Sequence, residues 1–155
     1  MEKIKTIALT WGSTGWHIFP LLSIYNYLRD ESQTITKYKF VWVWEEDSLE
    51  EEITRKYKIK FLSIPAWKIR RYLDLRNLYE PLKNLTGIAF WIHHIIKYKI
   101  NIVFSKWGYV SLPLCIAAFI LRRKIYIHES DTIKWIANKI IWKIATKVFY
   151  TFPNK

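Results

Sequence analysis

Residues 4–17 read IKTIALTWGSTGWH, an apolar, β-branched run followed by a short loop of small residues. Residues 4–9 have the length and composition of a buried strand. His17 then opens a pattern with helical spacing over residues 17–29. A strand, a loop with glycine and a helix in this order are the start of a βαβ unit, so this stretch predicts a parallel sheet.

The same alternation continues to the end of the chain. Further strands are predicted at residues 40–44, 59–63, 102–105, 125–128 and 147–151, and the clearest later helices at residues 80–99, 109–121 and 132–145. Short strands joined by helices give right-handed crossovers. We therefore expect an α/β fold: a doubly wound, Rossmann-like parallel sheet of about six strands. With 155 residues, 51% of them hydrophobic, the chain is long enough for one domain, residues 1–155, and too short for two ordinary ones.

The predicted helix over residues 80–99 carries an apolar stripe. Its members, at helical spacing, are Leu82, Leu85, Ile88, Ala89, Ile92, Ile95 and Ile96. Before it lies the longest irregular stretch, residues 64–79, which holds the basic residues Lys68, Arg70 and Arg71.

The charge is divided unevenly. Residues 1–52 hold 5 basic and 9 acidic side chains and residues 53–155 hold 20 and 4, so the two parts carry −4 and +16. A basic surface of this size attracts phosphate groups of any kind, although a solvated lysine-rich surface explains it equally well. The only cysteine, Cys115, lies in an apolar run and is expected to be a buried structural thiol, which fits a reducing cytoplasm. We expect no signal peptide, because the first residues alternate charged and apolar side chains. We expect no membrane span, because the longest apolar run, residues 112–121, is well short of the ~20 residues needed to cross a bilayer.

Unusual residues follow three of the predicted strands. They occupy residues 10–17, 105–111 and 128–131, after the first, fourth and fifth strands. In a doubly wound sheet, ligands bind beyond the carboxyl ends of the strands where the strand order reverses. The three loops are therefore expected to converge on one cleft.

These loops resemble the MurG family of glycosyltransferases, which adds N-acetylglucosamine to the lipid-linked muramyl-pentapeptide precursor of peptidoglycan. The family motifs are GGxTGGHIxP, GGYVS, and HEx[N/D] followed by PGxANK; here they read WGSTGWHIFP, WGYVS and HESDTIKWIANK. One such loop is weak evidence, whereas three in the right order on one sheet are specific. The resemblance covers the whole chain and implies the N-terminal, acceptor-side domain of an inverting GT-B enzyme.

Tryptophan stands where this family has glycine. The chain has 9 tryptophans and only 4 glycines. The tryptophans at family glycine positions are Trp11, Trp16, Trp44, Trp67, Trp107 and Trp135; the resemblance does not assign Trp42, Trp91 and Trp142 either way. Our hypothesis is that the source organism reads UGA as glycine and that the sequence was translated with tryptophan instead. The alternative is a degenerate or repurposed relative whose tryptophans are real.

The resemblance also implies the site residues. His17 is the candidate general base, because a histidine near its free pKa accepts a proton at neutral pH, and Glu129 is a second candidate. His17 could equally orient the loop, and a His-Glu pair could simply close a strand. The residues expected to bind substrate are Thr14, Gly15, Trp16, Tyr109, Ser111, His128, Asp131 and Asn138. An indole at position 16 would occupy space that the ligand needs. No metal is assigned, since His93 and His94 point about 100° apart on a helix, and no cofactor is expected.

The resemblance further implies the partners. They are UDP-N-acetylglucosamine (UDP-GlcNAc), the lipid-linked muramyl-pentapeptide acceptor (lipid I), and a C-terminal nucleotide-sugar domain that is absent from residues 1–155. Residues 67–99 combine basic and aromatic side chains, with Phe90 and Trp91 as an aromatic edge, which suits an anionic membrane surface. We therefore expect peripheral attachment to the cytoplasmic face of the cell membrane, and activity only together with the missing domain.

Two other interpretations remain open. The chain could be the acceptor-side subunit of a split glycosyltransferase, as in two-subunit eukaryotic and capsular enzymes. It could also be a non-catalytic module that binds anionic lipid or nucleic acid, since aromatic residues interleaved with lysine can serve single strands. The transferase interpretation predicts no nucleic-acid partner.

Overall fold

The computed structural model describes residues 3–11, 18–30, 36–44, 49–63, 80–106, 111–129 and 136–151. Strands and helices alternate, as the sequence predicts. In chain order the elements are β1 (Lys3–Trp11), α1 (Ile18–Asp30), β2 (Thr36–Trp44), α2 (Leu49–Lys56), β3 (Lys60–Ser63), α3 (Glu80–Lys97), β4 (Ile100–Lys106), α4 (Ser111–Ile120), β5 (Lys124–Glu129), α5 (Ile136–Ile144) and β6 (Lys147–Tyr150).

The strands form one six-stranded sheet in the order β3-β2-β1-β4-β5-β6. Every neighbouring pair is parallel. The order runs outward from β1 to β3 and then returns to the other side of β1, so it reverses between β1 and β4. The predicted doubly wound sheet is therefore confirmed.

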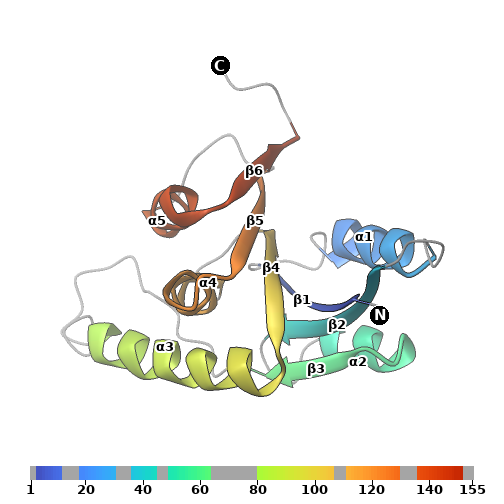
Figure 1. Cartoon of the computed structure of the whole chain (residues 1–155), viewed down its shortest axis with the longest axis horizontal. Helices are drawn as coiled ribbons and strands as arrows, with labels where there is room; N and C mark the ends of the chain where they lie inside the picture. The colour runs from blue at the N-terminus through green and yellow to red at the C-terminus, as the bar shows by residue number, and fades with distance from the viewer. Residues whose placement is uncertain are drawn as a thin grey trace.

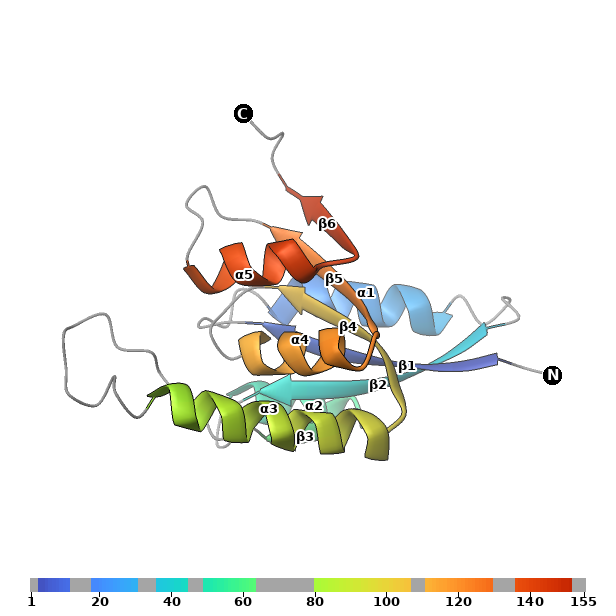
Figure 2. The same cartoon turned by 60° about the vertical axis from the view of Figure 1, so that its left-hand side comes forward.

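The helices form two layers. Figure 1 shows α1 and α2 on one face of the sheet and α3, α4 and α5 on the other, and the turned view in Figure 2 keeps this division. Right-handed crossovers impose it: the connections that build outward to β3 lie on one face, and those that build outward to β6 lie on the opposite face. No described helix covers β4, β5 and β6 on the α1 side.

Burial along β5 follows this arrangement. Ile125 and Ile127 are buried under α4, whereas Tyr126 and His128 point to the α1 side and are only half-buried. Successive side chains of a strand point to opposite faces, so one strand presents a covered and an uncovered row.

Three tryptophans fill the core beneath α1. Trp11 of β1 and both Trp42 and Trp44 of β2 lie on the same face of the sheet, because Leu9 pairs with Trp42 in the register. The Trp11 ring stacks on Trp44 at 4.7 Å with a 2° interplanar angle, and it meets Trp42 edge to face at 5.0 Å. This half of the sheet is packed by indoles.

Buried indole nitrogens are left without partners. Within the described parts of the chain, Nε1 of Trp11, Trp42 and Trp91 is buried with no hydrogen-bond acceptor. A buried donor without a partner costs about 1–3 kcal/mol. Native cores rarely tolerate several such groups, so these positions conflict with the usual rules of core packing.

The buried line of α3 differs from the predicted stripe. It runs through Gly87, Trp91 and Ile95, all buried, and α3 packs there against α4 and β4. The prediction was wrong for Ala89, which is exposed, and for Ile96, which is 57% exposed. The residues at i, i+4 and i+8 define a line tilted across the helix, and the contact with α4 selects that line. The side chains of Leu82 and Leu85 lie outside the described set.

Three helices end at a basic residue in the left-handed region. Lys58, Lys99 and Arg122 have φ of 53°, 51° and 52° and follow α2, α3 and α4. After α4, Arg122 N donates to Phe119 O at 2.9 Å and Arg123 N to Ala118 O at 2.8 Å, the pattern of a Schellman cap. Glycine usually takes this position, and here long cations replace it next to the negative end of each helix dipole. The cap at Lys99 explains why α3 stops at Lys97, short of residue 99.

Candidate functional site at the carboxyl edge of the sheet

The carboxyl ends of β1, β4 and β5 lie side by side. Trp11 pairs with Lys106 across β1 and β4, and Ser105 pairs with Ile127 across β4 and β5. This edge contains the point where the strand order reverses, which is where doubly wound sheets bind ligands. The strand order thus confirms that the three strands preceding the predicted loops end together.

Most predicted site residues lie outside the described residues. They are Thr14, Gly15, Trp16 and His17 in segment 12–17, Tyr109 in segment 107–110 and Asp131 in segment 130–135. Trp67, Trp107 and Trp135 also lie outside. Asn138 belongs to α5, but its side chain is not described. Their roles stay predictions.

His128 and Glu129 point to opposite faces of the sheet. Glu129 closes β5 on the side of α4 and is 8% exposed, whereas His128 is half-buried on the α1 side. The two neighbours therefore have different surroundings, and only His128 opens toward the α1 side. The role of Glu129 as a second base stays a prediction.

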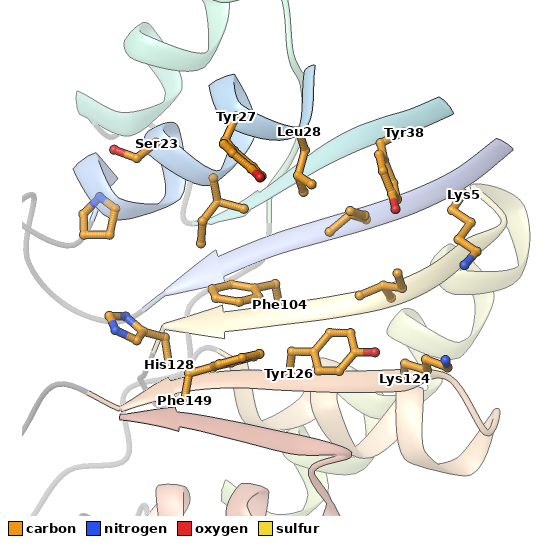
Figure 3. Close-up of a pocket in the computed structure, with 14 residues that line it drawn as sticks. Lys5, Ser23, Tyr27, Leu28, Tyr38, Phe104, Lys124, Tyr126, His128 and Phe149 are labelled. Carbon is orange, nitrogen blue, oxygen red and sulfur yellow. The ribbon is translucent and has the colours of Figure 1, made fainter. Parts of the chain in front are cut away.

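His128 stands at one end of an open hollow of about 790 Å³ between α1 and the sheet, lined by strands β4 to β6 and by the amino parts of β1 and β2. Figure 3 shows Phe104, Tyr126 and Phe149 along its floor and Tyr27 and Leu28 of α1 along its wall. His128 lies at the carboxyl end, and Lys5 and Lys124 lie at the amino end. The hollow is thus an apolar surface with several aromatic side chains, and it begins at a predicted substrate-binding residue.

Ser111 is the first residue of α4 and is fully buried. Its position places the amino terminus of α4 at the carboxyl edge of the sheet. The first backbone N–H groups of a helix have no partner within it and favour an anion beyond that end. The helix start can therefore contribute to anion binding even though the Ser111 side chain is enclosed.

Lys106 was not among the predicted site residues. It closes β4 at the reversal point and is only 6% exposed. A lysine is almost never buried unless its charge is compensated. The signal in the sequence was a charged residue between the buried strand and the WGYVS loop, and its burial became visible only with the sheet in place.

Cys115 lies on the side of α4 that faces away from solvent, and it is fully buried. Burial raises the pKa of its thiol from 9.0 to about 12. The thiol therefore stays protonated at neutral pH and is a poor nucleophile. The prediction of a buried structural cysteine is confirmed.

His94 of α3 is held by its own helix. His94 Nδ1 donates to the carbonyl oxygen of Phe90 at 2.8 Å, and its ring stacks on Phe90 at 3.9 Å. Among the described residues, no three His, Cys, Asp or Glu side chains are grouped closely enough to hold a metal ion.

The structure also bears on membrane contact. None of the helices in the described ranges is both long and apolar enough to cross a bilayer. The predicted aromatic edge is wrong for Trp91, which is fully buried against Phe90 and His94. The basic and aromatic residues of segment 64–79 lie outside the described set.

Comparison with known proteins identifies the domain. Residues 7–150 match the model of the glycosyltransferase family 28 N-terminal domain. The chain belongs to this family. It is 38% identical over 155 residues to a UDP-N-acetylglucosamine–N-acetylmuramyl-(pentapeptide) pyrophosphoryl-undecaprenol N-acetylglucosamine transferase of Borrelia turicatae, and 34% identical over 151 residues to one of Bacillus thuringiensis strain Al Hakam.

These family 28 relatives are longer than the chain. The matches cover 99% and 97% of this chain but 42% of each relative, so the chain spans about two fifths of their length. Among solved structures, MurG of Acinetobacter baumannii superposes with a TM-score of 0.79 at 24% identity, over 97% of this chain and 42% of that one. A UDP-GlcNAc 2-epimerase of Neisseria meningitidis gives 0.62 at 10% identity, over 91% and 39%. Both likenesses support the fold, and the family membership confirms the resemblance seen in the loops.

Proposed function

We propose that this domain is the acceptor-side half of an inverting glycosyltransferase that moves N-acetylglucosamine from UDP-GlcNAc to lipid I, forming lipid II of peptidoglycan. The observation that carries the proposal is the meeting of β1, β4 and β5 at the reversal of the sheet, directly before the loops that bear the three motifs. The names of the 38% and 34% identical relatives supply the reaction and its substrates.

The chemistry requires a base and positive potential. In an inverting transfer, the base removes the proton of the acceptor hydroxyl, the hydroxyl oxygen attacks the anomeric carbon, and the bond from that carbon to the diphosphate breaks. His17 is our candidate for the base, with Glu129 as the second candidate. The substrates are anionic, and the amino terminus of α4 at the same edge suits them.

The remaining parts of the proposal concern the whole protein. A second α/β domain after this one would supply the nucleotide-sugar pocket, and residues 1–155 alone would not turn over. Contact with the anionic cytoplasmic face of the membrane would bring the lipid-linked acceptor within reach, and no cofactor is required. The basic segment 64–79 is the part of the sequence that supports this attachment.

The test is transfer of labelled N-acetylglucosamine to a lipid I analogue by the full-length protein encoded with glycine at the six family glycine positions. His17→Ala should lower kcat by about 10²–10⁴-fold, the usual contribution of a general base. His93→Ala is the matched control, because His93 is exposed on α3, away from the carboxyl edge, and should leave the rate unchanged. Full activity of the His17 variant would refute the assignment of the base. Absence of any transfer by the glycine-encoded protein with His17 intact would refute the reaction.

A further inference from the structure

The ends of β5 and β6 are joined through one residue, Thr151. Its backbone N–H donates to the carbonyl oxygen of Glu129 at 2.9 Å. Its hydroxyl Oγ1 lies 3.0 Å from Nε2 of the His128 ring. Thr151 thus holds both the backbone and a side chain at the carboxyl end of β5.

The geometry places the ring at the carboxyl end of the hollow (Figure 3). His128 pairs in register with Phe149, so both side chains lie on the α1 side of the sheet, and Figure 3 shows them next to each other. Thr151 comes two residues after Phe149, on the same side of the strand. The ring therefore lies on the same side as Phe149 and has a hydrogen bond at Nε2 to Thr151.

We propose that Thr151 is a positioning residue, whose hydroxyl fixes the imidazole of His128 in the orientation that contacts the acceptor. This inference rests on the proposed function, which makes His128 an acceptor contact. Threonine suits the task because its β-branched side chain has few rotamers, and its backbone is already pinned to Glu129. A hydroxyl can donate to a neutral imidazole nitrogen or accept from an N–H, so the bond survives either tautomer.

The chain offers a matched control at the opposite end of the same two strands. Thr146 Oγ1 accepts from the backbone N–H of Ile125 at 3.0 Å, just before β6 begins. It is also a threonine hydroxyl that links β5 to the start of β6, but its partner is backbone and it lies at the amino edge, away from His128. A general loosening of the β5–β6 pair would follow from either substitution, whereas loss of ring orientation would follow only from Thr151→Val.

The first measurement follows the His128 ring in the 155-residue chain by ¹⁵N NMR. In Thr151→Val the Nε2 shift should move toward that of an unbonded imidazole, and in Thr151→Ser and Thr146→Val it should stay at its original value. An unchanged shift in Thr151→Val would overturn the proposal.

The second measurement uses the full-length protein and the lipid I analogue. Thr151→Val should raise the KM for the acceptor about three- to tenfold, the loss expected for one hydrogen bond, and Thr151→Ser should restore it. In a His128→Ala background, Thr151→Val should have no further effect, because it acts only through the ring. An equal effect in both backgrounds would overturn the positioning role. Full activity of His128→Ala, despite a ring shift that responds to Thr151→Val, would instead refute the acceptor contact of His128 and the functional part of this proposal with it.

Discussion

On the α1 side of the sheet, strands β1 and β2 form one half and strands β4 to β6 the other. The two halves are packed differently, although residues of β1 and β4 are direct neighbours across the sheet. On β1 and β2, Leu9, Trp11 and Trp42 are fully buried beneath α1. On β4 to β6, Phe104 is only half-buried and Phe149 is 40% exposed. Leu9 and Phe104 are direct neighbours across β1 and β4, so the boundary falls between two adjacent strands.

The difference comes from chain topology and not from residue type. Both halves carry large apolar side chains, yet the crossovers that reach β4, β5 and β6 place α3, α4 and α5 on the other face. A helix covers the carboxyl part of the first half, and the hollow of Figure 3 lies over the second half and the amino parts of β1 and β2. Large apolar side chains are therefore buried in the core on β1 and partly exposed on the neighbouring strand β4.

The largest expected effect concerns the tryptophan-packed half and the loops at its edge. In the full-length protein, glycine at positions 11, 16, 44, 67, 107 and 135 should raise the rate of transfer by about 100-fold or more over the protein with tryptophan there. An indole at position 16 would displace the substrate, whereas glycine permits close approach of the backbone. The buried Nε1 of Trp11 has no hydrogen-bond partner, which also favours glycine at this position. The measurement is the transfer assay, together with mass spectrometry of the native protein.

The control for this prediction is Trp142→Gly. Trp142 is 43% exposed on α5 and donates from Nε1 to the Tyr150 hydroxyl at 2.8 Å, away from the packed half. Its substitution should leave transfer unchanged. Native peptides that contain tryptophan at positions 11 and 16 would contradict the recoding hypothesis and favour a degenerate relative.

A smaller effect compares the two halves at their boundary. Leu9→Ala should lower the free energy of unfolding by about 2–5 kcal/mol, as for a fully buried leucine. Phe104→Ala should cost only about 1–2 kcal/mol although it removes a larger side chain, because part of that side chain already faces solvent. Urea unfolding of both variants measures the difference. Equal costs would mean that the β4 to β6 half is covered in solution.

The smallest effect at neutral pH concerns Cys115, on the helix-covered face. Burial raises the pKa of its thiol from 9.0 to about 12, so the folded state prefers the protonated form. Its contribution to stability is therefore fully present below about pH 9 and is lost as pH rises toward 12. The unfolding free energy of the wild type, relative to Cys115→Ala, should fall between pH 8 and pH 10.5. Iodoacetamide should label the thiol at pH 8 only in urea, and rapid labelling of the folded protein would contradict this burial.

Sequence patterns predicted the strands well and the helix faces less well. The runs at residues 4–9, 102–105 and 125–128 all lie inside observed strands, because buried parallel strands are continuous apolar segments that local composition reveals. The stripe on α3 was wrong at Ala89 and Ile96, since its buried line depends on α4. Lys106 and Thr151 were not predicted as site residues, because the sequence shows Lys106 only as a charge beside a motif and Thr151 only as the end of a strand; their surroundings depend on which strands are neighbours.

The sequence by itself determined the alternation of strands and helices, the three motif loops and the family, because each is a local pattern of side chains along the chain. Tertiary structure alone decided that β1, β4 and β5 end together, that His128 faces the α1 side, and that Thr151 reaches the His128 ring. Those relations depend on strand order and register, which join residues far apart in sequence. The hydrogen bonds between strands and the handedness of the crossovers fix them, and no local pattern contains that information.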